Sequence, residues 1–262
     1  NAINIFRAAN VMVRGNRIAN CAFSAVRGNA ASNLHVEGNS VSNTREVAIY
    51  AEFGFEGAVI ANNSVDRAAI GISITNFNAG GRLAVVQGNL IRNLLPRRPP
   101  GTDPGDSAGV GIAVEADTAV TGNVVENAPS AGIMLGWGHY LRDIAVTGNV
   151  VRKADIGIAV SVDTAVTGNV VENAPSAGIM LGWGHYLRDI AVTGNVVRKA
   201  DIGIAVSVVP GAGTALIANN VISDTLRGAI IGMARATPVT GDLAKAGGEQ
   251  FAHITLNGNR VR

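Results

Sequence analysis

Residues 117–162 read DTAVTGNVVENAPSAGIMLGWGHYLRDIAVTGNVVRKADIGIAVSV, and residues 163–208 repeat the same 46 residues without a change. Within each copy the six letters VTGNVV occur twice. A period of this size points to a repeat architecture, in which each repeat contacts its neighbours along one axis. The repeat therefore decides the fold before any single element does.

A finer period, marked by an asparagine in a V-x-G-N-x-V setting, runs through the whole chain. Successive asparagines are 20 to 26 residues apart, except for intervals of 34 before Asn123 and 39 before Asn259. The two long intervals hold residues 94–107 and 233–250, whose proline, glycine and charge content predicts surface loops. The ten marker positions are Asn16, Asn39, Asn63, Asn89, Asn123, Asn149, Asn169, Asn195, Asn220 and Asn259.

Alignment on the asparagine gives columns with a clear physical meaning. The positions three before and two after it are apolar in every repeat, and 19 of these 20 residues are β-branched, which favours strands. The residue directly before it is glycine or asparagine, as a left-handed bend requires. A third strand, G-I-x-[IVL], follows about eight residues later, for example at Gly157.

These columns predict an all-β fold: a single-stranded parallel β-helix of about ten coils, forming one domain over residues 1–262. The ten asparagines would then stack as an amide ladder at one corner. A leucine-rich repeat also fits the I-x-V-x-x-N-x-V spacing, but the core has few leucines and a strand occupies the place of its outer helix. No six-residue period supports a hexapeptide left-handed helix.

Composition excludes several classes of protein. A chain with 47% hydrophobic and 15% charged residues is not disordered. A net charge of +2 is too small to indicate a binding surface for nucleic acid. The single Cys21, which we expect to be a small core residue, excludes an internal disulfide and a cysteine-based zinc site. No apolar run is long enough for a membrane span. The chain opens at Asn1 without a signal peptide, so we expect a processed product.

The V-x-G-N-x-[VI] cores and the G-I-x-[VI] strands resemble the right-handed parallel β-helices of the pectate-lyase-like superfamily, in particular the PbH1 repeats of NosD-like and carbohydrate-associated exported proteins. The resemblance covers nearly the whole chain. The repeat sequence is also similar to that of bacterial repeat proteins exported by the twin-arginine route. It implies right-handed winding and a periplasmic or extracellular parent. It transfers no catalytic residue, metal ligand or cofactor: the nearest fragment, Gly138-His139-Tyr140, lacks the second glycine of the superfamily's hydrolase motif.

One lengthened turn, G-W-G-H-Y-L-R-D, occurs in alternate coils and carries aromatic side chains suited to stacking against sugar rings. Phe53, Phe55 and Phe77 stand at similar places in other coils, and a shared face would make a sugar-binding groove. The alternative is that Trp137 and Tyr140 fold back as a local apolar lid. The histidines are two coils apart, too far to share a metal. The candidate carbohydrate-binding residues are Trp137, His139, Tyr140, Trp183, His185 and Tyr186.

Three further expectations concern charge. Arg97 and Arg98, among prolines, are expected at a solvated loop tip, whereas Asp155 and Asp201 precede the third strand as turn residues. Opposite charges alternate along the rod three residues after the asparagine, and a two-coil copy preserves that order. The solvent loops of the two copies, such as residues 127–130, are also unchanged, so the copy is either a very recent duplication or two coils added by engineering, and we favour engineering. The alternating residues are Arg92, Glu126, Arg152, Glu172 and Arg198.

Three functions fit these patterns. The first is a structural solenoid, lengthened by two duplicated coils, without catalytic activity. The second is a protein that binds or degrades a polysaccharide on the face of the aromatic loops. The third is an element that assembles with itself through open strand edges at its ends. We expect no nucleic acid, membrane or cofactor as a partner.

Overall fold

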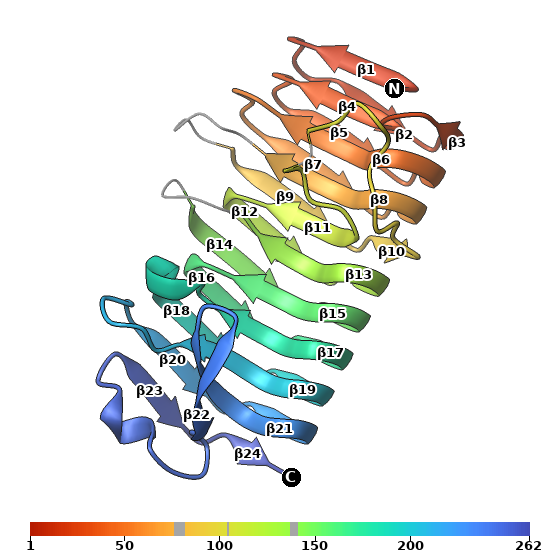
Figure 1. Ribbon diagram of the computed structural model, residues 1–262. Coiled ribbons are helices and arrows are strands. Elements are labelled where there is room, and N and C mark those ends of the chain that lie inside the picture. Colours follow the sequence, from red (N-terminus) through yellow and green to blue (C-terminus); the bar gives the residue numbers. More distant parts are fainter. Residues whose placement is uncertain (76–81, 104, 137–140) are drawn as a thin grey trace.

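The computed structural model describes residues 1–75, 82–103, 105–136 and 141–262. They form a parallel β-solenoid of about nine turns (Figure 1), which confirms the predicted fold class. The number of turns is about nine and not the expected ten. Ten marker asparagines enclose nine intervals, and the first and last coils are incomplete. No helix among the described residues is long and apolar enough to cross a bilayer.

One face of the rod is a ten-stranded parallel sheet that holds the strand before each marker asparagine. Each strand pairs in register with the next coil, for example Val120 with Val146. Its strands, in order, are β2 (Met12–Arg14), β5 (Leu34–Glu37), β7 (Ala58–Ala61), β9 (Ala84–Gln87), β12 (Ala116–Thr121), β14 (Arg142–Thr147), β16 (Val162–Thr167), β18 (Arg188–Thr193), β20 (Ala215–Ala218) and β23 (Ile254–Asn257).

A fourteen-stranded sheet forms the other two faces. Two short 3-10 helices, η1 (Gly184–Tyr186) and η2 (Gly248–Gln250), lie in connections. The strands are β1 (Ile3–Phe6), β3 (Arg17–Cys21), β4 (Val26–Asn29), β6 (Ser40–Glu52), β8 (Ser64–Thr75), β10 (Leu90–Arg92), β11 (Val110–Val114), β13 (Val124–Leu135), β15 (Val150–Val160), β17 (Val170–Leu181), β19 (Val196–Ser207), β21 (Val221–Ala234), β22 (Thr237–Asp242) and β24 (Arg260–Val261).

The second and third strands of a coil, predicted as separate, run on as one bent strand in most coils. In β13 the pairing with β15 shifts between Ala128 and Ala131, where the strand turns the corner. Asn127 and Lys153 take positive φ values of 57° and 54° at this bend. A single left-handed residue turns the chain without a loop, so the third strand follows directly.

The marker asparagines form the predicted ladder. Every one from Asn16 to Asn220 donates from its side-chain amide to the side-chain oxygen of the next, over nine steps of 2.9 to 3.0 Å. The same oxygen also accepts the preceding asparagine's backbone N–H, as Asn169 accepts from Asn149 at 2.9 Å. All ten residues before the markers have positive φ, as the glycine and asparagine pattern predicted.

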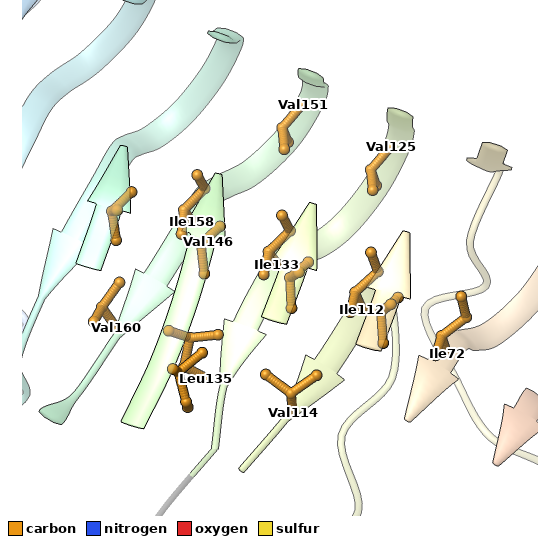
Figure 2. Packing of buried hydrophobic residues seen from close by; sticks show 14 of the residues in the cluster. Ile72, Ile112, Val114, Val125, Ile133, Leu135, Val146, Val151, Ile158 and Val160 are labelled. Carbon is orange, nitrogen blue, oxygen red and sulfur yellow. The ribbon is translucent and has the colours of Figure 1, made fainter. Parts of the chain in front are cut away.

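The core is a set of straight aliphatic rows. Ile72, Ile112, Ile133 and Ile158 pair in register and are fully buried (Figure 2). The third-strand glycines make room for this packing. A Cβ on Gly157 would clash with the side chain of Val171 and the carbonyl oxygen of Gly178. The glycine therefore lets neighbouring coils approach one another where a valine fills the corner.

Candidate functional site

The stretches in the two long repeat intervals lie over the same outer side of the rod, against the third-strand part of the large sheet (Figure 1). The connection from β10 to β11 covers one end. Residues 233–250, expected as a surface loop, include β22, which pairs antiparallel with β21 and borders the other end. Between them, no strand of the described residues covers this side of the sheet.

Three cavities of about 230, 220 and 290 Å³ lie in a row between these two segments. The first two share Ser107 and Met134, and the last two share Met180 and Trp183. Shared walls make them one continuous depression, which we call the groove. Its length is sufficient for a chain-like ligand rather than one small molecule.

The floor of the groove is a single in-register row of outward-facing side chains. The row is polar at its first end and then alternates alanine with methionine. At about 4.8 Å per strand, its six steps span about 29 Å. The row consists of Tyr50, Ser73, Ala113, Met134, Ala159, Met180 and Ala205.

Trp183 lies in the middle of the groove. It follows Gly182, whose φ is 74°, and its half-buried side chain lines both the 220 Å³ and the 290 Å³ cavities. Ser207 fixes the following turn by donating from its hydroxyl to the Gly184 carbonyl at 2.6 Å. The indole is thus held between two spaces, each large enough for a ring to lie beside it.

The other candidate aromatics divide differently. His185 and Tyr186 are exposed, with ring centroids 4.5 Å apart, and are not among the groove-lining residues. Phe55 is buried in the core, so the expected aromatic face does not include it, while Phe53 is partly exposed. The candidates Trp137, His139 and Tyr140, and also Phe77, lie outside the described residues.

The expectation that Arg98 lies at a solvated loop tip is wrong. Its side chain is only 10% exposed, and Nη1 lies 3.0 Å from Asp106 and 3.7 Å from Glu46. Nε donates to the Ser107 carbonyl at 2.7 Å. Because Glu46 belongs to β6, Arg98 ties the connection to the rod and makes it a fixed wall of the groove.

Tyr50 closes the polar end of the floor. Burial, with the nearby Glu52 carboxylate, raises the pKa of Tyr50 to about 12. The Arg27 guanidinium lies 5.3 Å from the ring centroid and forms an ion pair with Glu52. The phenol therefore keeps its proton at neutral pH and presents a neutral hydroxyl to the cavity.

At the opposite end the acidic residues have structural partners. Asp201 forms an ion pair with Arg227 at 3.1 Å, and Asp155 accepts from Ser176 at 2.7 Å. Neither residue lies at a strand end. Both lie inside the continuous strands β15 and β19, next to the register shift where the strand turns the corner, so the separate turn expected at these residues does not form. Asp242 accepts the backbone N–H groups of Ala229 and Ile230, each at 3.0 Å, which fixes the hairpin of β21 and β22.

A wider, open depression of about 860 Å³ lies on the ten-stranded sheet. It follows a row of aspartates, one per coil, at left-handed corners. Arg142 pairs with Asp117 and Arg188 with Asp163, each at 2.7 Å. Arginines of neighbouring coils pair with these two carboxylates, so the aspartates have a structural role at the corners of the rod. We therefore consider the groove, and not this depression, as the candidate ligand site.

Similarity to known proteins shows the family of this chain and supports its fold. The family model described as "Periplasmic copper-binding protein (NosD)" matches residues 104–234, half of the 262 residues. The chain belongs to the NosD family. The match covers most of the groove floor, and the family is described as periplasmic. A search of curated proteins found no match.

The described residues of this NosD-family chain do not fit a copper site. Copper takes imidazole, thiolate and thioether ligands, but no three His, Cys, Asp or Glu residues gather within the described ranges. Burial raises the pKa of the Cys21 thiol, which disfavours the ligating thiolate. Met134 and Met180 are two strands apart, about 10 Å, too far to bind one ion.

Solved structures show the same fold at low identity. The tailspike protein of E. coli bacteriophage HK620, in complex with a pentasaccharide, is 15% identical with a TM-score of 0.64, over 97% of this chain and 52% of the tailspike chain. A hyperthermoactive exopolygalacturonase from Thermotoga maritima is 11% identical with a TM-score of 0.58, over 91% and 55%. The NosD-family chain thus spans about half the length of these proteins.

Proposed function

We propose that this NosD-family chain is an exported β-solenoid that binds a polysaccharide along the groove, with sugar rings stacked on Trp183. The observation that carries the proposal is the position of Trp183 between two cavities of one long depression. Aromatic faces with polar groups nearby suit pyranose rings, which have apolar faces and hydroxyl edges.

Three features of the groove support a chain-like ligand. Its floor runs over seven strands of a rigid sheet, so a bound chain would meet a fixed surface. Both end walls are fixed, by Arg98 at one end and by Asp242 at the other. Tyr50 and Thr75 place hydroxyl groups at the polar end, where sugar hydroxyls need partners, and the buried Ser73 hydroxyl holds that of Thr75 at 2.7 Å.

The similar proteins lend support at the level of fold. The tailspike structure holds a pentasaccharide, and the Thermotoga protein is an exopolygalacturonase. In this proposal the rod is the rigid scaffold expected from the sequence, and the groove is its binding surface. We assign no catalytic residue, so the proposed activity is binding.

Binding is tested on a glycan array with the full chain, followed by calorimetry on the best oligosaccharide. We expect Trp183→Ala to lower affinity at least about tenfold, because stacking and ring burial are both lost. Tyr186→Ala is the matched control, since it removes an exposed aromatic three residues away that does not line the groove. Equal affinity of the Trp183 variant and the wild type would contradict the proposal, and depolymerisation of the bound glycan would add an enzymatic role.

A further inference from the structure

Arg235 is a cation at the tip of the hairpin that borders the groove. Ala234 pairs with Thr237, so Arg235 and Ala236 form the two-residue turn between β21 and β22. Arg235 has a φ of 56°, in the left-handed region where such turns prefer glycine or asparagine. An arginine here costs backbone strain that a glycine would avoid.

The Arg235 side chain is placed at the groove. It lines the 290 Å³ cavity together with Trp183 and Met180. A Cβ added to Gly184 would lie 3.6 Å from its Cγ and 3.8 Å from its Nε, so the side chain extends over the turn that follows Trp183. The guanidinium therefore lies on the same side of the hairpin as the indole.

The charges around this cavity leave a positive excess. Asp201 is the carboxylate among the lining residues, and it is paired with Arg227 at 3.1 Å. Within the described residues no carboxylate lies within 4.0 Å of the Arg235 guanidinium, and Asp201 is already neutralised by Arg227. A guanidinium with free donors beside an aromatic face suits a ring that carries an anionic group.

We propose that the groove selects an acidic polysaccharide, with an anionic sugar stacked on Trp183 and its carboxylate or sulfate group bound by Arg235. This inference rests on the proposed glycan binding and adds the charge class of the ligand.

The test uses the full chain and three variants on an array of neutral, uronate-containing and sulfated glycans. Arg235→Gly removes the cation and relieves the turn, so its Tm should equal or exceed that of the wild type. Arg235→Lys keeps the charge. Arg14→Ala removes an exposed cation on β2, near the other end of the rod, and controls for net charge.

We expect acidic glycans among the wild-type ligands, and a loss of affinity of about tenfold or more for Arg235→Gly, since charge-assisted hydrogen bonds are lost. Arg235→Lys should retain part of the affinity, and Arg14→Ala all of it. Calorimetry with tetragalacturonate and its methyl ester, or with a sulfated glycan and its desulfated form, separates the two anion types. Preference for neutral glycans, or affinity indifferent to Arg235→Gly, would overturn this inference alone. Absence of any ligand that depends on Trp183 would overturn the proposed function as well.

Discussion

Each interior marker asparagine makes a full set of hydrogen bonds at a buried corner. The Asn149 amide donates to Asn169 at 2.9 Å and to the Val120 carbonyl at 3.0 Å, and its oxygen accepts from Asn123. Asn149→Ala removes both its donors and the acceptor of Asn123, so we expect a loss of about 1–3 kcal/mol in the free energy of unfolding. Urea denaturation measures this loss.

The exposed Thr147→Ala serves as the control, with a change of about 0.5 kcal/mol or less. If Asn149→Ala were as stable as this control, the ladder would be a result of the fold and would not stabilise it.

Glu172 links pH to stability through three basic residues on neighbouring coils. A hydrogen bond from Lys199, with the charges of Arg198 and Arg152, lowers its pKa below the usual 4.5. A lowered carboxylate pKa stabilises the fold above the unfolded value, and this contribution disappears as pH falls through the folded value. Glu172→Gln should therefore reduce the drop in Tm between about pH 6 and pH 3.

Glu249→Gln, at an exposed carboxylate in η2, is the control for the loss of one negative charge. If the Glu172 variant and the wild type had identical pH profiles of Tm, the alternating charges would not contribute to stability.

How much the sequence predicts differs between residues for a physical reason. The ladder, the left-handed bends and the alternation of Arg152 with Glu172 repeat in every coil or every second coil, so the pattern itself reveals them. Arg98 was misplaced because its partner Glu46 lies 52 residues earlier, outside any repeat. Arg235 gave no signal, since its role depends on which face its hairpin covers.

At the scale of elements, the stretches 94–107 and 233–250 were visible as departures from the period, but their common side was not. The stretch 94–107 interrupts its coil between β10 and the third strand β11, whereas 233–250 continues from the third-strand end of β21. Both stretches therefore border the third-strand side. The groove is therefore a property of two insertions taken together, which no single motif encodes.

Removal of residues 163–208 tests the duplicated pair of coils. Val162 would then join Val209, in the same context as Val208, and Trp137 would take the place of Trp183 beside the hairpin. We expect a cooperative fold with a rod about 10 Å shorter in small-angle scattering. The variant should also bind a shorter minimum oligosaccharide than the full chain does.

An unfolded deletion variant would show that the second copy is integral to the rod, against the interpretation that two coils were added. If the minimum length of the bound oligosaccharide did not change, the ligand would not lie along the floor row.

At the scale of the whole molecule, one rod serves two purposes. Its interior rows and its amide ladder hold the coils in register, and that register sets the floor of the groove in line from Tyr50 to Ala205. Trp183 and Arg235 come from different coils and line the same cavity because the coils stack. Binding in this account is a consequence of repeat geometry combined with two interruptions of the repeat.

The most direct measurement is a crystal structure of the full chain with the best oligosaccharide from the array. The account predicts sugar rings along the row from Ser73 to Ala205, one of them against the Trp183 indole with an anionic group within hydrogen-bonding distance of Arg235. Density for the glycan on the ten-stranded sheet, or at an end of the rod, with the groove empty, would contradict it.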